Sequence, residues 1–220
     1  MGLIAIGDIH GCARTLDRLL ERLAPSADDH LVFVGDYIDR GPDSNGVISR
    51  LLALRDQVRC TFLRGNHEAL MLGYLDQGEY DLWHVNGGAA TLDSYVTDSA
   101  HRHVDIPTAH LDFIRSTALY ADTPDFFFVH AGLKPHLSIA ENLARYDEDV
   151  FLWERGHLQA RELAWEKCVV CGHTPQPEPI NRERLIAIDT GCVYHLHPQL
   201  GRLTAVRLPE RTFVSVPYEG

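Results

Sequence analysis

The sequence has no long hydrophobic run, no excess of positive charge and no even set of cysteines. None of the apolar runs in its 220 residues approaches the roughly 20 residues that a helix needs to cross a bilayer. The residues after Met1 include Asp8 and His10, where a secretory signal would have a basic start and an apolar stretch. These absences predict a soluble, cytoplasmic protein without a membrane partner.

Positive charge is scarce, because 20 Lys and Arg residues face 31 Asp and Glu residues and give a net charge of −11. Nonspecific nucleic-acid binding needs clustered Lys and Arg to replace the counterions of the phosphate chain, so we expect no nucleic-acid partner. An anionic substrate must then be held locally, by bound cations and a few placed arginines. Arg40 and Arg64 are candidates for that role.

The cysteines form an odd set of five without a secretory context, which favours reduced thiols over a disulfide framework. Cys168 and Cys171 have the spacing of a redox or zinc pair. In a strand, however, residues three apart point to opposite faces, and no second pair completes a zinc site. We therefore expect a structural role for this pair.

The chain alternates short apolar strands with amphipathic helices, which predicts an α/β layered fold. Apolar runs at 3–6, 31–34 and 61–63 predict strands, and apolar residues at helical spacing predict helices over 14–23 and 47–54. At this length and with 45% hydrophobic residues, we expect one globular domain over 1–220. A weaker pattern predicts a mainly helical insertion at about 68–116. The second half is richer in strands, predicted at 125–129, 167–171, 185–188, 203–208 and 211–216.

Polar clusters follow several of these predicted strands directly. Three neighbouring strands would bring their polar loops to one edge of a sheet, and two histidines, His130 and His173, follow later apolar runs. Acid, amide and imidazole donors together suit borderline cations such as manganese, iron or zinc. A carboxylate between two cations can bridge them, and a bridging water can lose a proton to become a nucleophile. The six candidate ligands are Asp8, His10, Asp36, Asn66, His130 and His173.

Five spaced motifs give the sequence a resemblance to a known family. They are Gly-Asp-Ile-His-Gly at 7–11, Gly-Asp-Tyr-Ile-Asp-Arg-Gly at 35–41, Arg-Gly-Asn-His-Glu at 64–68, Val-His-Ala-Gly at 129–132 and Cys-Gly-His-Thr-Pro at 171–175, with weaker companions at 86–88, 152–155 and 188–191. The set resembles the phosphoprotein phosphatase branch of the calcineurin-like metallophosphoesterases, in particular small bacterial and phage-lambda-type enzymes. The resemblance implies a four-layer sandwich of two mixed sheets flanked by helices.

The same resemblance implies a role for each polar residue. Asp8 and His10 would hold the first of two divalent metals, Asn66, His130 and His173 the second, and Asp36 would bridge them. His67 would be the general acid, oriented by Asp39 through the other ring nitrogen. Arg40, Arg64 and Arg155 would grip the phosphoryl oxygens. The metals would be Mn²⁺, with Fe or Zn as alternatives.

The leading interpretation is a serine/threonine protein phosphatase with some phosphotyrosine activity, whose partner is a phosphorylated protein or peptide. The alternative is hydrolysis of symmetrical diadenosine tetraphosphate or another nucleotide phosphoester, by relatives with the same ligands. Those hydrolases usually lack the acid at position 39 and end the third motif in Asp, whereas this chain has Asp39 and Glu68. A remote alternative is a noncatalytic module that binds phosphoproteins, although such modules usually lose a ligand or the acid.

Other polar residues admit a structural explanation. Glu68 suits either a partner of the site or an acid at the start of a helix. Trp83 and Tyr95 are core aromatics or shape a substrate groove. Among the remaining histidines, His84 is the one we expect nearest the site, because it lies within the insertion.

Overall fold

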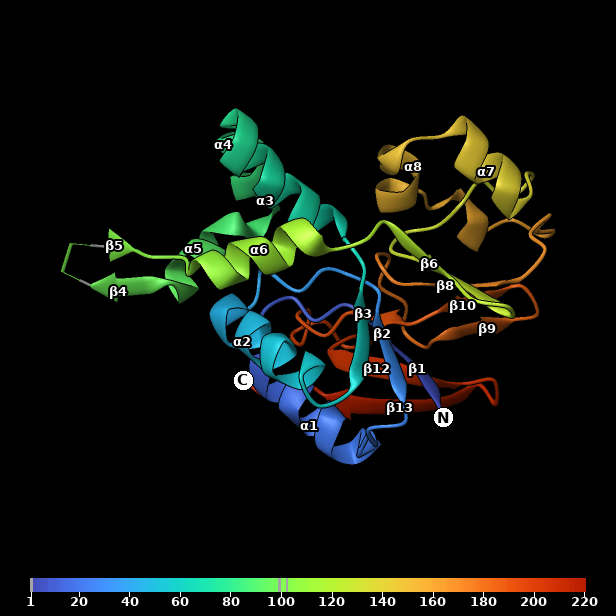
Figure 1. The fold of residues 1–220 in the computed structure, drawn as a ribbon, viewed down its shortest axis with the longest axis horizontal. Helices are drawn as coiled ribbons and strands as arrows, with labels where there is room; N and C mark the ends of the chain where they lie inside the picture. Colours follow the sequence, from blue (N-terminus) through green and yellow to red (C-terminus); the bar gives the residue numbers. More distant parts are fainter. Residues whose placement is uncertain (1, 99, 102) are drawn as a thin grey trace.

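The computed structural model describes residues 2–98, 100, 101 and 103–220, and two β-sheets form its centre (Figure 1). The first sheet has the order β11-β12-β1-β2-β3, with β13 paired to β12. Strands β1, β2 and β3 are parallel neighbours, so their carboxyl ends meet at one edge as the sequence predicted. The strands of this sheet are β1 (Leu3–Ile6), β2 (His30–Phe33), β3 (Arg59–Phe62), β11 (Asp189–Thr190), β12 (Arg202–Leu208) and β13 (Thr212–Pro217).

The second sheet has the order β6-β7-β8-β10-β9. Its three central strands, β7, β8 and β10, run parallel, and the outer two pair antiparallel. Both sheets are therefore mixed. The strands are β6 (Tyr120–Asp122), β7 (Phe126–Val129), β8 (Cys168–Cys171), β9 (Ile180–Arg182) and β10 (Leu185–Ala187).

Alternate residues along each buried strand belong to different hydrophobic cores, as the period of two in a strand requires. Phe126 and Phe128 pack between the two sheets, whereas Phe127 and Val129 face the helices on the outer side. The same alternation separates Cys168 from Cys171, and all five cysteines are free thiols. Nearly continuous apolar strands arise here because both faces of each sheet are covered.

Helices cover the outer face of each sheet and complete the four layers (Figure 1). Buried side chains of α1 (Ala13–Leu23), α2 (Ser44–Arg55) and α6 (Thr108–Ser116) pack on the first sheet. Those of α7 (Ile139–Arg145) and α8 (Glu148–Trp153), followed by a 3₁₀ turn at Gly156–Leu158, pack on the second. The predicted four-layer sandwich is confirmed.

The segment predicted as a mainly helical insertion also contains a small hairpin. Its helices are α3 (Asn66–Gln77), α4 (Tyr80–Trp83), the π-helix η1 (His84–Gly88) and α5 (Ala89–Ser94). The hairpin of β4 (Val96–Asp98) and β5 (His103–Val104) extends at the left of Figure 1. Strands of two or three residues are too short for a periodic pattern, so the sequence did not indicate them. Among the described residues, no helix has the length and apolar character that crossing a membrane would require.

Candidate dimetal site

Six polar side chains converge where five parallel strands end. Asp8 and His10 follow β1, Asp36 follows β2 and Asn66 follows β3, while the second sheet contributes His130 after β7 and His173 after β8. None of the six is more than 7% exposed. Sequence separations of up to 165 residues are bridged, because the His173 backbone N–H donates to Asp8 Oδ2 at 2.9 Å. The structure thus brings all six predicted ligands together.

The first group is built around His10. Its Nδ1 donates to the Ile38 carbonyl at 2.9 Å, so its Nε2 is an acceptor, which lies 3.4 Å from Asp36 Oδ2. Asp8 Oδ1 is buried without a hydrogen-bond partner. A buried carboxylate oxygen without a donor is costly, and a bound cation would satisfy it.

The second group is built around His130. Its Nδ1 donates to the Val34 carbonyl at 2.9 Å, so its Nε2 is an acceptor. That nitrogen lies 3.0 Å from Asn66 Oδ1, 3.2 Å from His173 Nδ1 and 3.5 Å from Asp36 Oδ1. Nitrogen and oxygen atoms of ligand type that converge at these distances suit a shared cation.

Asp36 lies between the two groups, with Oδ2 toward His10 and Oδ1 toward His130. Two sets of three buried side chains have ligand atoms within 4.8 Å of one another, and Asp36 belongs to both. One set is Asp36, His130 and His173; the other contains His67 beside His10 and Asp36, where the sequence prediction has Asp8. His67 uses its Nδ1 for Asp39, and the unpartnered oxygen of Asp8 makes Asp8 the better third ligand.

Burial sets the protonation of the imidazoles. It lowers the pKa of His10 to about 3 and that of His173 to about 2, and it lowers the pKa of His130 as well. The three rings are therefore neutral near pH 7 and have lone pairs to give. Metal ligation requires that state.

Carboxylates are crowded in the same volume. Burial, helped by Asp189 and Asp36, raises the pKa of Asp8, and burial raises the pKa of Glu68 and of Asp189 to about 7 each. Asp36 differs: burial alone would raise its pKa, but the imidazoles around it, His130 first, hold the pKa well below the usual range. Four buried acids so close together are costly unless cations neutralise them.

Part of the backbone at the site lies in the left-handed region. Outside glycine, seven described residues have positive φ, and five of them are predicted site residues: His10, Asp36, Asp39, Arg40 and His173. Such conformations cost of order 1 to 3 kcal/mol each and persist where the surroundings impose them. Glycines allow the close approach that does so, since a Cβ on Gly172 would lie 2.0 Å from Asp8 Oδ1.

His67 and Asp39 form a fully buried pair beside the ligands. His67 Nδ1 donates to Asp39 Oδ2 at 2.7 Å, and His67 Nε2 has no partner. Burial alone would lower the pKa of His67, but Asp36 and Asp39 outweigh it and raise the pKa. The geometry therefore fits a proton donor whose free nitrogen is Nε2.

The three predicted arginines are not equally placed. Arg40 Nη1 donates to His10 Nε2 at 2.9 Å and Arg155 Nε to His173 Nε2 at 3.0 Å, so one guanidinium lies against each ligand group. Arg64 instead donates to the Arg115 and Thr117 carbonyls and lies 3.7 Å from Glu148. The structure brings two arginines to the site and directs the third to the end of α6.

Glu68 combines the two alternatives that the sequence left open. It is the acid in the first turn of α3, and its Oε2 accepts from the Gly65 and Asp36 N–H groups at 2.9 and 2.8 Å. Its Oε1 accepts from Tyr37 N–H at 2.8 Å. One carboxylate thus fixes both the helix start and the loop that carries Asp36.

Sequence reasoning did not assign three of the contributors their roles at this site. Trp83 Nε1 and Thr91 Oγ1 both donate to the Asp39 carboxylate, and Asp189 is a buried acid beside Asp8. Trp83 is buried, so it belongs to the core and not to the wall of a groove. His84 is exposed and its ring lies against that of Tyr80. Tyr95 is buried and bonds His110.

A hollow of about 410 Å³ adjoins the site. Asn66 and Arg64 line it on one side and Trp153 on the other, with α3 and α8 as its walls. Trp153 is 40% exposed, and its ring lies edge-on to His173 with 5.8 Å between centroids. Four acidic residues also line the hollow: Asp76, Glu79, Glu148 and Asp149.

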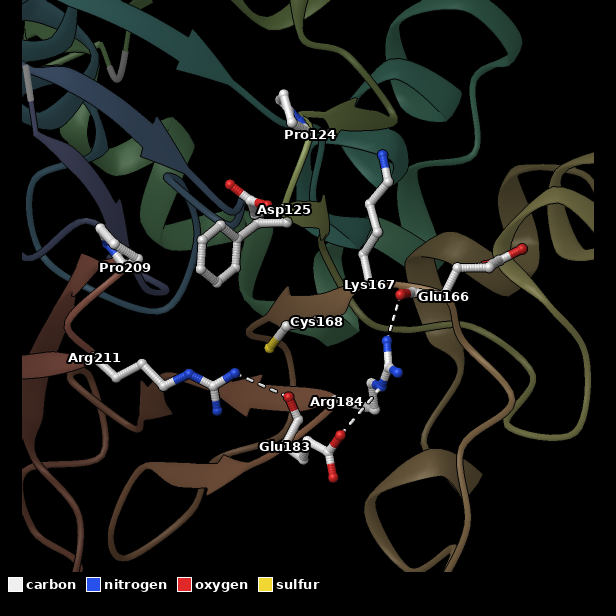
Figure 2. A pocket seen from close by; sticks show the side chains of 10 residues that line it. Pro124, Asp125, Glu166, Lys167, Cys168, Glu183, Arg184, Pro209 and Arg211 are labelled. Atoms are coloured by element: carbon white, nitrogen blue, oxygen red, sulfur yellow. Dashed lines mark hydrogen bonds and ion pairs between the residues drawn. The ribbon is translucent and has the colours of Figure 1, made fainter.

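A second hollow lies at the opposite end of the second sheet, where β7, β8 and β10 begin (Figure 2). Lys167, Arg184 and Arg211 line it. Each already donates to protein acceptors: Lys167 to Asp122, Arg184 to the Glu166 carbonyl and Arg211 to the Glu183 carbonyl. Because these cations already have acceptors, this hollow is a weaker candidate for a functional site than the convergent polar groups described above.

The family is now clear. The sequence model of the calcineurin-like phosphoesterase family matches residues 1–205, so the chain belongs to that family. It is a metal-dependent phosphoesterase, in agreement with the resemblance of its motifs and with two sheets that bring Asp, Asn and His side chains together. When bound, divalent cations would neutralise phosphoryl oxygens and activate a water for attack.

The names of individual relatives indicate two different activities. The chain is 30% identical to the asymmetrical bis(5'-nucleosyl)-tetraphosphatase PrpE of Geobacillus thermodenitrificans, over 99% of this chain and 94% of the relative. It is also 30% identical to serine/threonine-protein phosphatase 1 of Salmonella typhimurium, over 92% and 90%. A solved structure described as a candidate diadenosine tetraphosphatase has a TM-score of 0.72 and 26% identity, covering 100% of this chain and 94% of that one.

These comparisons favour the alternative that the sequence analysis ranked second. Several of the relatives are tetraphosphatases of the same name, from different bacteria, at 28 to 30% identity. The preference for a phosphoprotein rested on Asp39 and Glu68, and the structure shows what both residues do locally. Glu68 binds backbone N–H groups, so its identity reports on the loop and not on the substrate.

Proposed function

We propose that this chain hydrolyses dinucleoside polyphosphates and cleaves a phosphoanhydride bond beside the six predicted ligands. The observation that carries the proposal is the hollow lined by Asn66 and Trp153. A half-exposed aromatic face next to a phosphate site suits a nucleobase, because every base has a π-face that can stack on it. The names of the tetraphosphatase relatives support the same substrate class.

The charges around the hollow set the direction of the substrate. Asp76, Glu79, Glu148 and Asp149 line it, and although Arg115 pairs with Asp76 and Arg64 lies 3.7 Å from Glu148, no excess of positive charge is left there to hold a polyphosphate chain. Arg40 and Arg155 lie against the ligand imidazoles, where phosphate is expected. The nucleoside therefore enters the hollow, and the phosphates extend across the ligands toward Arg40, whose guanidinium lies 5.6 Å from the Tyr194 ring centre.

The cofactor proposal follows from the donor set. Asp8, Asp36 and Asn66 offer oxygen and three histidines offer nitrogen, a mixture that suits Mn²⁺, with Fe and Zn as alternatives. His10 and His130 are each fixed by a backbone carbonyl on the other ring nitrogen. We therefore assign two divalent cations to the site, and reconstitution with each metal in turn identifies the active one.

The experiment that tests the substrate class follows product formation from a bis(5'-nucleosyl) tetraphosphate with Mn²⁺. Off-centre cleavage gives a nucleoside monophosphate and a triphosphate, whereas central cleavage gives two diphosphates. Chromatography separates these products. Turnover of phosphopeptides without turnover of the dinucleotide would overturn the proposal, and absence of any turnover with every metal would favour a noncatalytic module.

A second candidate is a serine/threonine protein phosphatase, and one observation favours it. Asp39 and His67 form a fully buried, hydrogen-bonded pair with a free His67 Nε2. A serine or threonine alkoxide is a strongly basic leaving group and needs a proton, whereas a nucleotide phosphate leaves without one. A phosphatase relative at 30% identity supports this candidate.

Comparison of kcat/KM for the dinucleotide and for a phosphoserine peptide separates the two candidates. A ratio above about 10 in favour of the dinucleotide corresponds to about 1.4 kcal/mol of preferential transition-state binding. A ratio below one would establish the second candidate. An inactive peptide with serine in place of phosphoserine serves as the competitor control.

A further inference from the structure

The Asp39 carboxylate is held by two side chains from the segment between α3 and β4. Trp83 Nε1 donates to both oxygens, at 3.0 and 2.9 Å, and Thr91 Oγ1 donates to Oδ1 at 2.6 Å. All three residues are fully buried. Neither donor lies in a loop that carries a predicted metal ligand, so these two side chains act on the site through Asp39.

Thr91 holds the backbone of Asp39 as well as its side chain. The Asp39 N–H donates to Thr91 Oγ1 at 2.9 Å and also contacts Ser44 Oγ at 3.2 Å. Asp39 has a φ of 72°, a conformation that needs such support in a residue with a side chain. The neighbouring residue is held similarly, since Arg40 N–H donates to the Gly87 carbonyl at 3.2 Å.

Hydrogen counting fixes the direction of this network. A carboxylate only accepts, so the single hydroxyl proton of Thr91 goes to Asp39 Oδ1. Ser44 Oγ, 3.0 Å from Thr91 Oγ1, then donates to Thr91. The remaining acceptor, Asp39 Oδ2, faces His67 Nδ1 at 2.7 Å. In the neutral ring the proton therefore resides on Nδ1, and Nε2 carries the lone pair.

We propose that Trp83 and Thr91 are positioning residues, which orient Asp39 so that His67 donates its Nδ1–H to Asp39 and, as the imidazolium, presents its Nε2–H to the leaving oxygen, which takes up that proton. The proposal rests on the role assigned to His67. Without the two donors, Asp39 can rotate about its side-chain bonds and offer either oxygen, and the His67 ring loses its fixed orientation. The orientation of the general acid therefore depends on Trp83 and Thr91, which lie 44 and 52 positions from Asp39 in the sequence.

A purely structural role is the competing explanation and needs its own control. Trp83 also stacks on Tyr74, with 5.1 Å between ring centroids, and packs against Gly88. Thr91→Val is nearly isosteric and removes only the hydroxyl, and Thr91→Ser retains it. Thr15→Val serves as a matched control, because Thr15 is also fully buried but bonds to Glu219 at the far end of the chain.

The test measures the His67 tautomer directly, by long-range ¹H–¹⁵N correlation in the Zn²⁺-loaded protein at a pH where the ring is neutral. We expect an Nδ1-protonated ring in the unmodified protein, in Thr15→Val and in Thr91→Ser. Thr91→Val should give a mixture of tautomers. An unchanged tautomer in both Thr91→Val and Trp83→Phe would overturn the proposal whatever substrate the enzyme uses.

Kinetics give the second readout. Thr91→Val should lower kcat about 10- to 100-fold for an alkyl phosphate and less than about 3-fold for p-nitrophenyl phosphate, whose leaving group needs no proton. Thr91→Ser should restore the alkyl rate to within about 3-fold. Equal losses on both esters would contradict the positioning role. If the unmodified enzyme does not cleave alkyl phosphates, that result concerns its substrate class and not the positioning role. The tautomer measurement then decides the proposal alone.

Discussion

Glu68 accepts a hydrogen bond from the backbone N–H of Asp36 at 2.8 Å, so one buried carboxylate holds the peptide group that carries another. The two side chains reach this arrangement from different strands. Asp36 follows β2, and Glu68 lies in the first turn of α3 after β3. The contact ties the central ligand to the helix start, and it makes the stability of the loop depend on one side chain.

Glu68→Gln should destabilise the protein by about 2 to 4 kcal/mol, because the amide NH₂ of glutamine would face backbone donors that now meet a carboxylate oxygen. Urea unfolding measures this free energy. Glu210→Gln, at an exposed position, is the matched control and should change stability by less than about 0.5 kcal/mol. Equal stability of the two variants would show that the N–H groups find other acceptors.

Asp36→Asn should lose both metals, whereas Asp8→Asn should lose one. Asp36 has one oxygen toward each ligand group, and Asp8 contributes to the first group only. Elemental analysis of the purified, dialysed variants gives the stoichiometry. Asp125→Asn is the control, because Asp125 is exposed at the far end of the second sheet (Figure 2). Full occupancy in Asp36→Asn would refute the bridging role.

His67→Asn should keep the bound metals and lower kcat about 10²- to 10⁴-fold for phosphoserine, but far less for p-nitrophenyl phosphate. The reason is the proton that an alkoxide leaving group takes up and a nitrophenolate does not. Parallel assays on the two esters and a metal determination check both statements. A uniform loss across leaving groups would show that His67 has another role.

Trp153→Ala should raise KM for the dinucleotide about 10-fold or more, since stacking on one base is worth about 1 to 3 kcal/mol. Hydrolysis of a small alkyl phosphate, which has no base, should change little. Trp153→Phe retains a smaller aromatic face and should recover most of the affinity. If KM for both substrates rises together, the side chain supports the site and does not stack on a base.

Stability should fall as the pH drops from about 6.5 to about 4, and His157 should account for part of the loss. Burial lowers the pKa of His157 to about 4, so the unfolded chain binds more protons than the folded one within this window. The contribution of His157 to the free energy of unfolding is therefore fully present above the pKa of histidine in the unfolded chain. Acidification removes about 3 kcal/mol of it.

Urea unfolding of His157→Leu across this pH range checks the assignment. The variant should show a shallower dependence of unfolding free energy on pH than the unmodified protein. His136→Gln, at an exposed position, should retain the full slope. An unchanged slope in His157→Leu would mean that other buried groups cause the acid sensitivity.

The layers and the ligands could be predicted from sequence because each depends on local pattern. An apolar strand followed at once by Asp, Asn or His places that side chain at a sheet edge, and parallel neighbours such as β1 and β2 then gather such edges. The observed ends of some elements differ slightly from the predicted ones. Strand β3 ends at Phe62, whereas the prediction ended at residue 63.

Contacts between distant segments could not be predicted. Trp83 and Thr91 reach Asp39 only because the insertion folds back over the second loop, and no pattern near either residue signals it. Arg64 has the motif position of a phosphate ligand, yet its Nη2 donates to the carbonyls of Arg115 and Thr117. The choice between substrates could not be predicted for the same reason. The sequence analysis used Glu68 to discriminate between them, but in the structure this side chain accepts hydrogen bonds from backbone N–H groups.

The left-handed backbone at His10, Asp36, Asp39, Arg40 and His173 has a practical consequence for engineering. Glycine relieves that strain, so a screen that rewards only heat resistance or expression would favour glycine at the positions where these side chains are predicted to act. Libraries for stabilising this scaffold should therefore keep these five codons constant and vary the outer helices, where α1 and α2 tolerate change on their exposed faces.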